Sequence, residues 1–189
     1  MTPVPTFPQP SPADDHASPV QSLHAADGRP LALRAIAPAD VDRLRTFIEG
    51  LSYGSRYFRF GRGDARFDAA ELAHVCDPDP RREAHLVIVT DAGTVIASAR
   101  YVVHDDDAER CEFGLVIADA WQDQGLGQHL LQALIELAER RGLRLMDGEV
   151  LATNTRMLDF ARRAGFEPDA GSESAPVRRI RRQLGAARG

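Results

Sequence analysis

The stretch 112–138 limits the possible folds of this chain more than any other, because three patterns follow one another in it without a break. Residues 112–117 form a short, mostly apolar run that is typical of a buried strand. Residues 130–138 carry leucine, isoleucine and alanine at helical spacing. The hexad Gln122-Asp123-Gln124-Gly125-Leu126-Gly127 lies between these two runs. We therefore predict a strand, a turn that contains two glycines, and a long amphipathic helix.

The turn of this unit is suited to hold an anion. A helix that begins near Gly125 leaves its first backbone N–H groups without partners inside the helix, and the helix dipole adds a positive potential there. Glycine at positions 125 and 127 allows a ligand to come close to this backbone. We therefore interpret the hexad as a main-chain cradle for a pyrophosphate.

Other interpretations of the same turn are weaker or less specific. A P-loop is excluded, because it requires a Gly-Lys-Ser/Thr sequence and the chain contains no lysine. A Rossmann turn requires a third glycine at the position of Leu130, so that match is poor. An ordinary α/β protein can also join a strand to a helix through glycines that bind nothing. The turn alone does not separate this last interpretation from a ligand site.

The rest of the chain alternates short β-rich runs with amphipathic helical stretches. Strands are expected at 31–36, 84–90, 94–103, 112–117, 143–152 and 177–184, and helices at 38–51, 55–60, 67–75, 125–141 and 154–164. This order predicts an α/β protein with a mixed, strongly twisted sheet and helices on both faces. We expect the aromatic residues of 52–60 to pack in the core, with a substrate-facing rim as the alternative.

The first thirty residues differ in composition from the rest. They hold seven of the twelve prolines, with Ser, Asp and Gln between them and little apolar content. We therefore expect residues 1–29 to be a disordered, proline-rich tail. The length of 189 residues suits a single hydrophobic core, so residues 30–189 are expected to form one domain.

Charge, cysteine content and hydropathy argue against several classes of function. A net charge of −5 does not favour nucleic acid or an anionic membrane as the main partner. Cys76 and Cys111 are too few for a disulfide framework and lack metal-ligand spacing, so we expect no metal. No apolar run approaches the ~20 residues of a membrane span. The N-terminus lacks the features of a secretory signal, which makes the cytoplasm the expected location.

The hexad and two further segments resemble a known enzyme family. Gln122, Gly125 and Gly127 fill the three defined positions of motif A, Gln/Arg-x-x-Gly-x-Gly/Ala, of the GNAT family of acyl-CoA-dependent N-acetyltransferases. Segments 33–61, 111–127 and 148–167 are similar to the acetyltransferase domain of bacterial Pat-type protein lysine acetyltransferases. The chain resembles that domain without the large synthetase-like or nucleotide-sensing domain often fused to it.

The resemblance implies a fold and a co-substrate. The fold would be the GNAT fold, a twisted, mostly antiparallel sheet with splayed central strands and helices on both faces. Acetyl-CoA would lie where the strands that carry Glu112 and Glu149 separate, and no metal would take part. Backbone groups of Leu115, Val116 and Ile117 would pair with the pantetheine arm. The residues expected to bind acetyl-CoA are Leu115, Val116, Ile117, Gln122, Asp123, Gln124, Gly125, Leu126, Gly127, Gln128 and Asn154.

The pattern departs from the family at Asp123, where many relatives carry arginine or lysine. A carboxylate beside a diphosphate is unfavourable, so we expect Asp123 to point to solvent. A second departure is Ala161, at a position where many members place a tyrosine that protonates the departing thiolate. Tyr101 on a neighbouring strand is a candidate substitute, and water is the alternative.

Two carboxylates are candidates for the general base. A lysine ammonium has a pKa of ~10.4, so a partly buried glutamate near the thioester must accept its proton, directly or through water. Glu112 matches the base of Pat-type enzymes, and Glu149 matches the base of ribosomal N-terminal acetyltransferases. We favour Glu112 because the closer resemblance is to Pat. The alternative is that either carboxylate only pairs with an arginine such as Arg144.

We therefore expect an acetyl-CoA-dependent N-acetyltransferase that works by direct transfer in a ternary complex. The expected acceptor is a protein lysine, for example on an acyl-CoA synthetase. One alternative is an enzyme that acetylates a small amine or a protein N-terminus. The other is a non-catalytic sensor module that binds acyl-CoA. Oligomeric state stays open.

Overall fold

The computed structural model describes residues 21–169, 171 and 175–185. Within them a single eight-stranded sheet has the order β1-β2-β3-β4-β5-β6-β8-β7. The strands are β1 (Gln21–His24), β2 (Pro30–Ala35), β3 (Glu83–Thr90), β4 (Val95–Val103), β5 (Arg110–Ile117), β6 (Leu145–Leu151), β7 (Glu167–Pro168) and β8 (Val177–Gln183). The helices are α1 (Val41–Gly50), α2 (Tyr53–Phe60), α3 (Ala69–Cys76), α4 (Leu126–Arg140) and α5 (Thr155–Arg163), with 3-10 turns η2 (Pro38–Asp40) and η3 (Asp119–Trp121).

The N-terminal boundary predicted from composition is wrong. Strand β1 lies inside the stretch expected to be a disordered tail, and it pairs antiparallel with β2 from Gln21↔Leu33 to His24↔Pro30. Leu23 is buried in the core, which explains why this short, polar segment is ordered. The earlier part of the predicted tail, residues 1–20, lies outside the described residues. The short strand β7 was also absent from the prediction.

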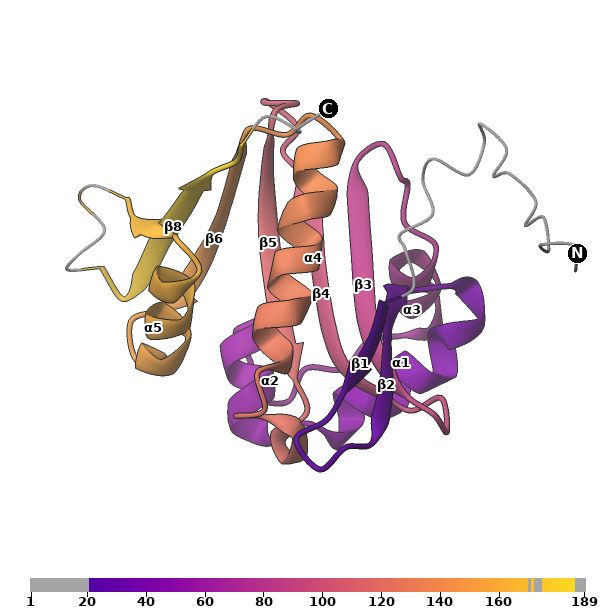
Figure 1. The fold of residues 1–189 in the computed structure, drawn as a ribbon. Coiled ribbons are helices and arrows are strands. Elements are labelled where there is room, and N and C mark those ends of the chain that lie inside the picture. Colours follow the sequence, from indigo (N-terminus) through magenta and orange to yellow (C-terminus); the bar gives the residue numbers. More distant parts are fainter. Residues whose placement is uncertain (1–20, 170, 172–174, 186–189) are drawn as a thin grey trace, which may run out of the picture.

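The predicted mixed, twisted sheet is confirmed. Every described pair of neighbouring strands is antiparallel except β5 and β6, which run parallel. Their pairing covers only three residue pairs and ends at Glu112↔Asp147. Beyond that point β6 diverges from β5, as Figure 1 shows. The second half of β5 therefore has a strand partner on one side only.

Helices cover both faces of the sheet, as predicted (Figure 1). Leucines and isoleucine of α4 pack with β3, β4 and β5 in the larger core, which α5 joins through Ala161. Helices α1 and α3 pack on the opposite face in a second core around Leu44, Phe47 and Leu72. The helical stripe predicted for 38–51 is therefore the buried face of α1.

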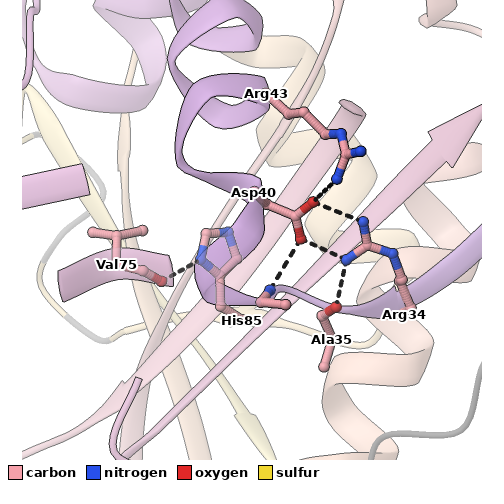
Figure 2. Close-up of polar contacts among 7 residues, drawn as sticks. Arg34, Ala35, Asp40, Arg43, Val75 and His85 are labelled. Carbon is pink, nitrogen blue, oxygen red and sulfur yellow. Dashed lines mark hydrogen bonds and ion pairs between the residues drawn. The ribbon is translucent and has the colours of Figure 1, made fainter. Parts of the chain in front are cut away.

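A buried carboxylate fixes the start of α1 to β2 (Figure 2). The Asp40 side chain is only 1% exposed and accepts hydrogen bonds from two nitrogens of Arg34, at 2.6 and 2.9 Å. It also accepts from Arg43 at 2.9 Å and from the backbone N–H of Ala37 at 3.0 Å. The Arg34 guanidinium holds the pKa of this carboxyl far below its usual range. This network fixes the start of α1 against β2.

Buried His85 makes the corresponding link between β3 and α3. Its Nδ1 lies 3.2 Å from the carbonyl oxygen of Val75, so Nδ1 must carry the proton and donate (Figure 2). Its Nε2 then accepts from the hydroxyl of Ser98 at 2.7 Å. Burial lowers the pKa of His85 to about 4, so the ring is neutral near pH 7.

A search of the described helices for a membrane span, which requires both sufficient length and an apolar composition, finds no candidate.

Candidate active site

The separation of β5 and β6 opens a cavity of about 910 Å³. It is bounded by β5, β6, the loop that contains the hexad, the start of α4, α5 and one side of α2. All eleven predicted binding residues except Gln124 line it, as do Glu112 and Glu149. The structure therefore brings together residues from 112 to 154 that the sequence placed in separate segments. Gln124 instead accepts a hydrogen bond from the N–H of Ala26 at 3.4 Å.

The backbone of β5 offers free groups to this cavity. The N–H of Ala118 donates to Ile96 at one end of the β4–β5 ladder, and the N–H of His104 donates to Arg110 at the other. Since backbone groups of alternate residues point to opposite edges of a strand, Leu115 and Ile117 present theirs to the cavity. By the same alternation the backbone groups of Val116 point towards β4, although Val116 also lines the cavity.

Gln122 has a structural task that the motif alone did not reveal. Its side-chain nitrogen donates to the carbonyl oxygen of Ile117 at 3.1 Å and so fixes the loop to the end of β5. The carbonyl of Ile117 is thereby occupied, and its N–H remains for a ligand. The loop then follows Gln122 with a defined orientation relative to the free edge of the strand.

The start of α4 has the geometry expected of an anion cradle. Gly125 is the residue before the helix and adopts φ +77°, a conformation that other residues rarely tolerate. Among the described residues, none accepts a hydrogen bond from the N–H groups of Leu126 and Gly127. A Cβ atom at Gly127 would lie 3.4 Å from the ring of Phe160, which is an ordinary contact distance, so the start of α4 lies close against α5. These N–H groups are positioned to bind phosphate oxygens.

A cation from α5 lies beside the cradle. Arg156 donates to Asp123 at 2.6 Å and to the side-chain oxygen of Gln122 at 2.8 Å. Asp123 is 83% exposed, as predicted, but it also holds this guanidinium at the cavity wall. Asp123 adopts φ +62°. Sequence reasoning missed Arg156; the signal was an arginine two residues after the asparagine that begins α5.

The two candidate bases differ in their partners. Glu149 lies opposite Arg179 on β8 and accepts its hydrogen bond at 3.1 Å. Glu112 is exposed to the cavity, and within the described chain it has no hydrogen-bond or ion-pair partner. The expectation of a partly buried base is therefore wrong for Glu112. Arg144 pairs with neither carboxylate, since it lies 3.5 Å from Glu109.

Tyr101 is not available to protonate a leaving group in this cavity. It is buried on the α4 side of the sheet, where its hydroxyl accepts from Arg141 at 2.9 Å, and it does not line the cavity. Ala161 is buried and offers no acidic group. Asn154 lines the cavity, but its side-chain oxygen caps α5 by accepting from the N–H of Met157 at 3.1 Å. Only its amide nitrogen therefore remains to donate to a ligand.

Helix α2 forms a rim, so the core packing expected for this segment is wrong. The exposed fractions are 68% for Tyr53, 39% for Tyr57 and 43% for Phe58. Its N-terminus is held by Asp119, which accepts hydrogen bonds from the hydroxyls of Ser52 and Ser55, each at 2.7 Å. The periodicity of the segment indicated a helix but could not show which residues have a neighbour to pack against.

Arg59 of α2 is a further cavity residue that sequence reasoning did not identify. Its guanidinium lies on Gly114 of β5, with Arg100 and Glu112 near enough to influence its charge. A second, smaller cavity of about 270 Å³ begins here and extends beneath α1 and α3. Among the described residues there is no cluster of His, Cys, Asp and Glu side chains that could hold a metal ion.

Comparisons with known proteins agree with this geometry. The family described as "Acetyltransferase (GNAT) family" matches residues 54–166. The chain is 32% identical over 161 residues to a protein named Acetyltransferase PA5475 from Pseudomonas aeruginosa. That match covers 82% of this chain and 85% of the relative.

Two further similarities concern proteins called Pat. Acetyltransferase Pat of Mycolicibacterium smegmatis is 30% identical over 134 residues, which are 70% of this chain but 40% of that protein. The chain therefore spans less than half of the length of this relative. The crystal structure of the GNAT domain of S. lividans PAT superposes with a TM-score of 0.80 at 26% identity. This superposition covers 87% of the chain and 97% of that domain.

Proposed function

The chain belongs to the GNAT family of acetyltransferases, whose members transfer an acyl group from acetyl-CoA, and we propose from this premise that it acetylates protein lysines. One observation carries the proposal: the free edge of β5 leads directly to unpaired N–H groups at the start of α4, within one cavity. A ligand that carries an amide-containing arm and a diphosphate fits this sequence of donors and acceptors.

The groups on β5 would hold the acyl-bearing end of the donor. Leu115 and Ile117 offer N–H groups, and Leu115 also offers its carbonyl, as a neighbouring strand would. An N–H directed at the thioester oxygen favours attack, because negative charge grows on that oxygen as the amine adds. Asn154 would donate to the arm with its remaining amide hydrogens.

The loop and α4 would hold the diphosphate, with help from Arg156. The N–H groups of Leu126 and Gly127 face the cavity without a partner in the described structure. Many relatives carry a cation at position 123, but this chain has an aspartate there. The positive charge beside the diphosphate would instead come from Arg156 of α5. When a diphosphate competes for the guanidinium, Arg156 would leave Asp123 and bind the phosphate oxygens.

Glu112 would act as the general base. A lysine amine must lose a proton before or while it attacks the thioester, and a carboxylate without a partner is free to accept that proton, directly or through one water. The new C–N bond forms as the C–S bond breaks, and the coenzyme A thiolate leaves. Ala161 stands at the position of the tyrosine that many family members use, and no described tyrosine lines the cavity. Water would therefore protonate this thiolate.

The choice of a protein lysine as acceptor is supported by two features. Segments 33–61, 111–127 and 148–167 resemble Pat-type protein lysine acetyltransferases, and the fold is similar to the GNAT domain of S. lividans PAT. Helix α2 carries exposed aromatic side chains on which a protein surface could pack, and one of them, Phe58, lines the same cavity as Glu112. A small amine or a protein N-terminus is the second candidate.

Release of free coenzyme A from acetyl-CoA tests this proposal. We expect turnover with a protein that carries a reactive lysine, such as an acyl-CoA synthetase, and loss of turnover in Glu112→Gln. The Glu109→Gln variant is a matched control, because Glu109 precedes β5 and does not line the cavity. Binding of acetyl-CoA without turnover on any amine would instead favour a sensor module. Absence of binding in a calorimetric titration would refute both functions.

A further inference from the structure

Arg59 reaches the active-site cavity only because position 114 is glycine. A Cβ atom built on Gly114 would lie 2.5 Å from the Cζ and Nη2 atoms of Arg59 and 2.7 Å from Nη1. These distances are far below any real contact, so a side chain at this position would displace the guanidinium. The pair thus places a cation of α2 directly against the central part of β5.

Within the described part of the chain, Arg59 has no hydrogen-bond or ion-pair partner, and its guanidinium contacts the ring of Phe60, with Cζ 5.3 Å from the ring centre. Its guanidinium has five N–H donors, and no described residue accepts a hydrogen bond from it or forms an ion pair with it. Burial, and then the charge of Arg100, lower its pKa to about 10, while Glu112 acts in the opposite direction. Arg100 itself has a partner in Glu83, at 3.8 Å. The Arg59 side chain is partly exposed and lines the cavity, so an anionic group bound there could accept its hydrogen bonds.

The position of Arg59 indicates where such a ligand would lie. Arg59, Glu112 and Gly114 line both the large cavity and the smaller one beneath α1 and α3. Gly114 directly precedes Leu115, whose N–H faces the large cavity. A group that continues past the reacting carbonyl along β5 therefore reaches the guanidinium before it enters the smaller cavity.

We propose that Arg59 binds a carboxylate carried by a reactant, and that its place beside Leu115 favours the far end of the acyl chain of a dicarboxylic acyl-CoA. This inference rests on the proposed function of the cavity. A carboxylate matches the planar, two-donor edge of a guanidinium, which binds it through two parallel hydrogen bonds. The acyl carboxylate stays unchanged while the C–N bond forms and the C–S bond breaks.

The same chemistry could come from the acceptor, so the experiment has two arms. The donor arm compares kcat/KM for succinyl-CoA and butyryl-CoA, which differ in the terminal carboxylate. The acceptor arm uses acetyl-CoA and compares Nα-acetyllysine with Nα-acetyllysine amide. We expect wild type to prefer the carboxylate-bearing reactant in one arm, and Arg59→Gln to reduce this preference by about 10- to 100-fold, the value of a charge-assisted hydrogen bond.

Two further variants separate recognition from a general effect. Gly114→Ala retains the charge but displaces the guanidinium, so it should reduce the same preference. Arg62→Gln is the control, because Arg62 is exposed and does not line either cavity. The dissociation constant of coenzyme A, measured by calorimetry, checks the cradle independently, so its loss would count against the proposed function rather than against Arg59.

The inference is overturned if wild type shows no preference in either arm, or if Arg59→Gln lowers kcat/KM equally for both members of each pair. The second result would mean that Arg59 only positions Glu112. A preference in the donor arm supports an acyl carboxylate, and a preference in the acceptor arm supports an acceptor carboxylate.

Discussion

The two walls of the active-site cavity are built in different ways. On the β5 wall, neither Glu112 nor Arg59 has a hydrogen-bond or ion-pair partner among the described residues, although the strand is paired along its length with β4 and flanked by α2 and α4. On the β6 wall, Glu149 pairs with Arg179, and Arg156 pairs with Asp123. Asp147 joins the walls where they meet, since it binds Arg110 and lies 3.2 Å from His104.

The difference indicates a division of labour. Glu112, which can accept a proton, and Arg59, a cation without an ion-pair partner among the described residues, lie on the wall that the main core supports, and such support keeps reactive groups in place. The β6 wall is joined to β5 by three residue pairs, and its charged side chains form ion pairs with one another. We infer that the β5 wall performs the chemistry and binds the donor together with α4, whereas the β6 side assists through Asn154 and Arg156.

The largest predicted difference between the two walls is in the turnover rate. Glu112→Gln should lower kcat by about 10²- to 10⁴-fold, because it removes the general base. Glu149→Gln should lower it by less than about tenfold, because this side chain is already bonded to Arg179. Coenzyme A release under saturating acetyl-CoA measures both. A larger loss in Glu149→Gln would move the chemistry to the β6 wall.

The support of the β5 wall can be tested through Asp40. Asp40→Asn should lower the free energy of unfolding by about 3–5 kcal/mol, because Arg34 loses a buried, doubly bonded carboxylate. Denaturation in urea, followed by circular dichroism, measures this change. Asp159→Asn is the matched control, since the Asp159–Arg162 pair at 3.0 Å is exposed and should contribute less than about 1 kcal/mol. Equal losses in the two variants would show that the buried Asp40 contacts contribute no more to stability than an exposed ion pair.

His85 makes the same region sensitive to acid. Burial lowers its pKa to about 4 in the folded state, while the unfolded value is near 6.5, so the unfolded chain binds more protons between these limits. The stabilisation is therefore present above pH 6.5 and is lost as the pH falls towards 4, by up to about 3 kcal/mol. Urea denaturation across this range should show the loss, and His85→Gln should flatten it. An unchanged slope in the variant would place the titrating group elsewhere.

The smallest expected effect concerns the β6 wall. Arg156→Gln should weaken coenzyme A binding by about two- to fivefold, the scale of an exposed ion pair, and Asp123→Asn should strengthen it by a similar factor. The opposite signs follow because Asp123 competes with the diphosphate for the same guanidinium. Calorimetric dissociation constants at low salt measure both. If both variants weakened binding, the Arg156–Asp123 pair would have a structural role only.

Several features of the fold could be read from the chain without coordinates. The run 112–117, the two glycines of the hexad and the leucines of α4 specify their local structures through spacing alone. Asp68 illustrates the same principle, since an aspartate is a favoured residue before a helix and this one caps α3 by accepting from the N–H of Glu71 at 2.8 Å. Other features could not be predicted. Strand β1 is stabilised by Leu23 and its pairing with β2, and the tail-like composition of the segment gives no sign of either.

By itself the sequence determined the order of elements, the glycine turn and the candidate carboxylates, because these depend on neighbours along the chain. Only the tertiary structure decided that, among the described residues, Glu149 has a hydrogen-bond partner and Glu112 has none, that the backbone of Val116 faces β4, and that α2 is a rim. It also brought Arg59 onto Gly114 and Arg156 to Asp123. Such contacts depend on which segments meet across the sheet, and the free energy of a charge is set by the groups around it in space.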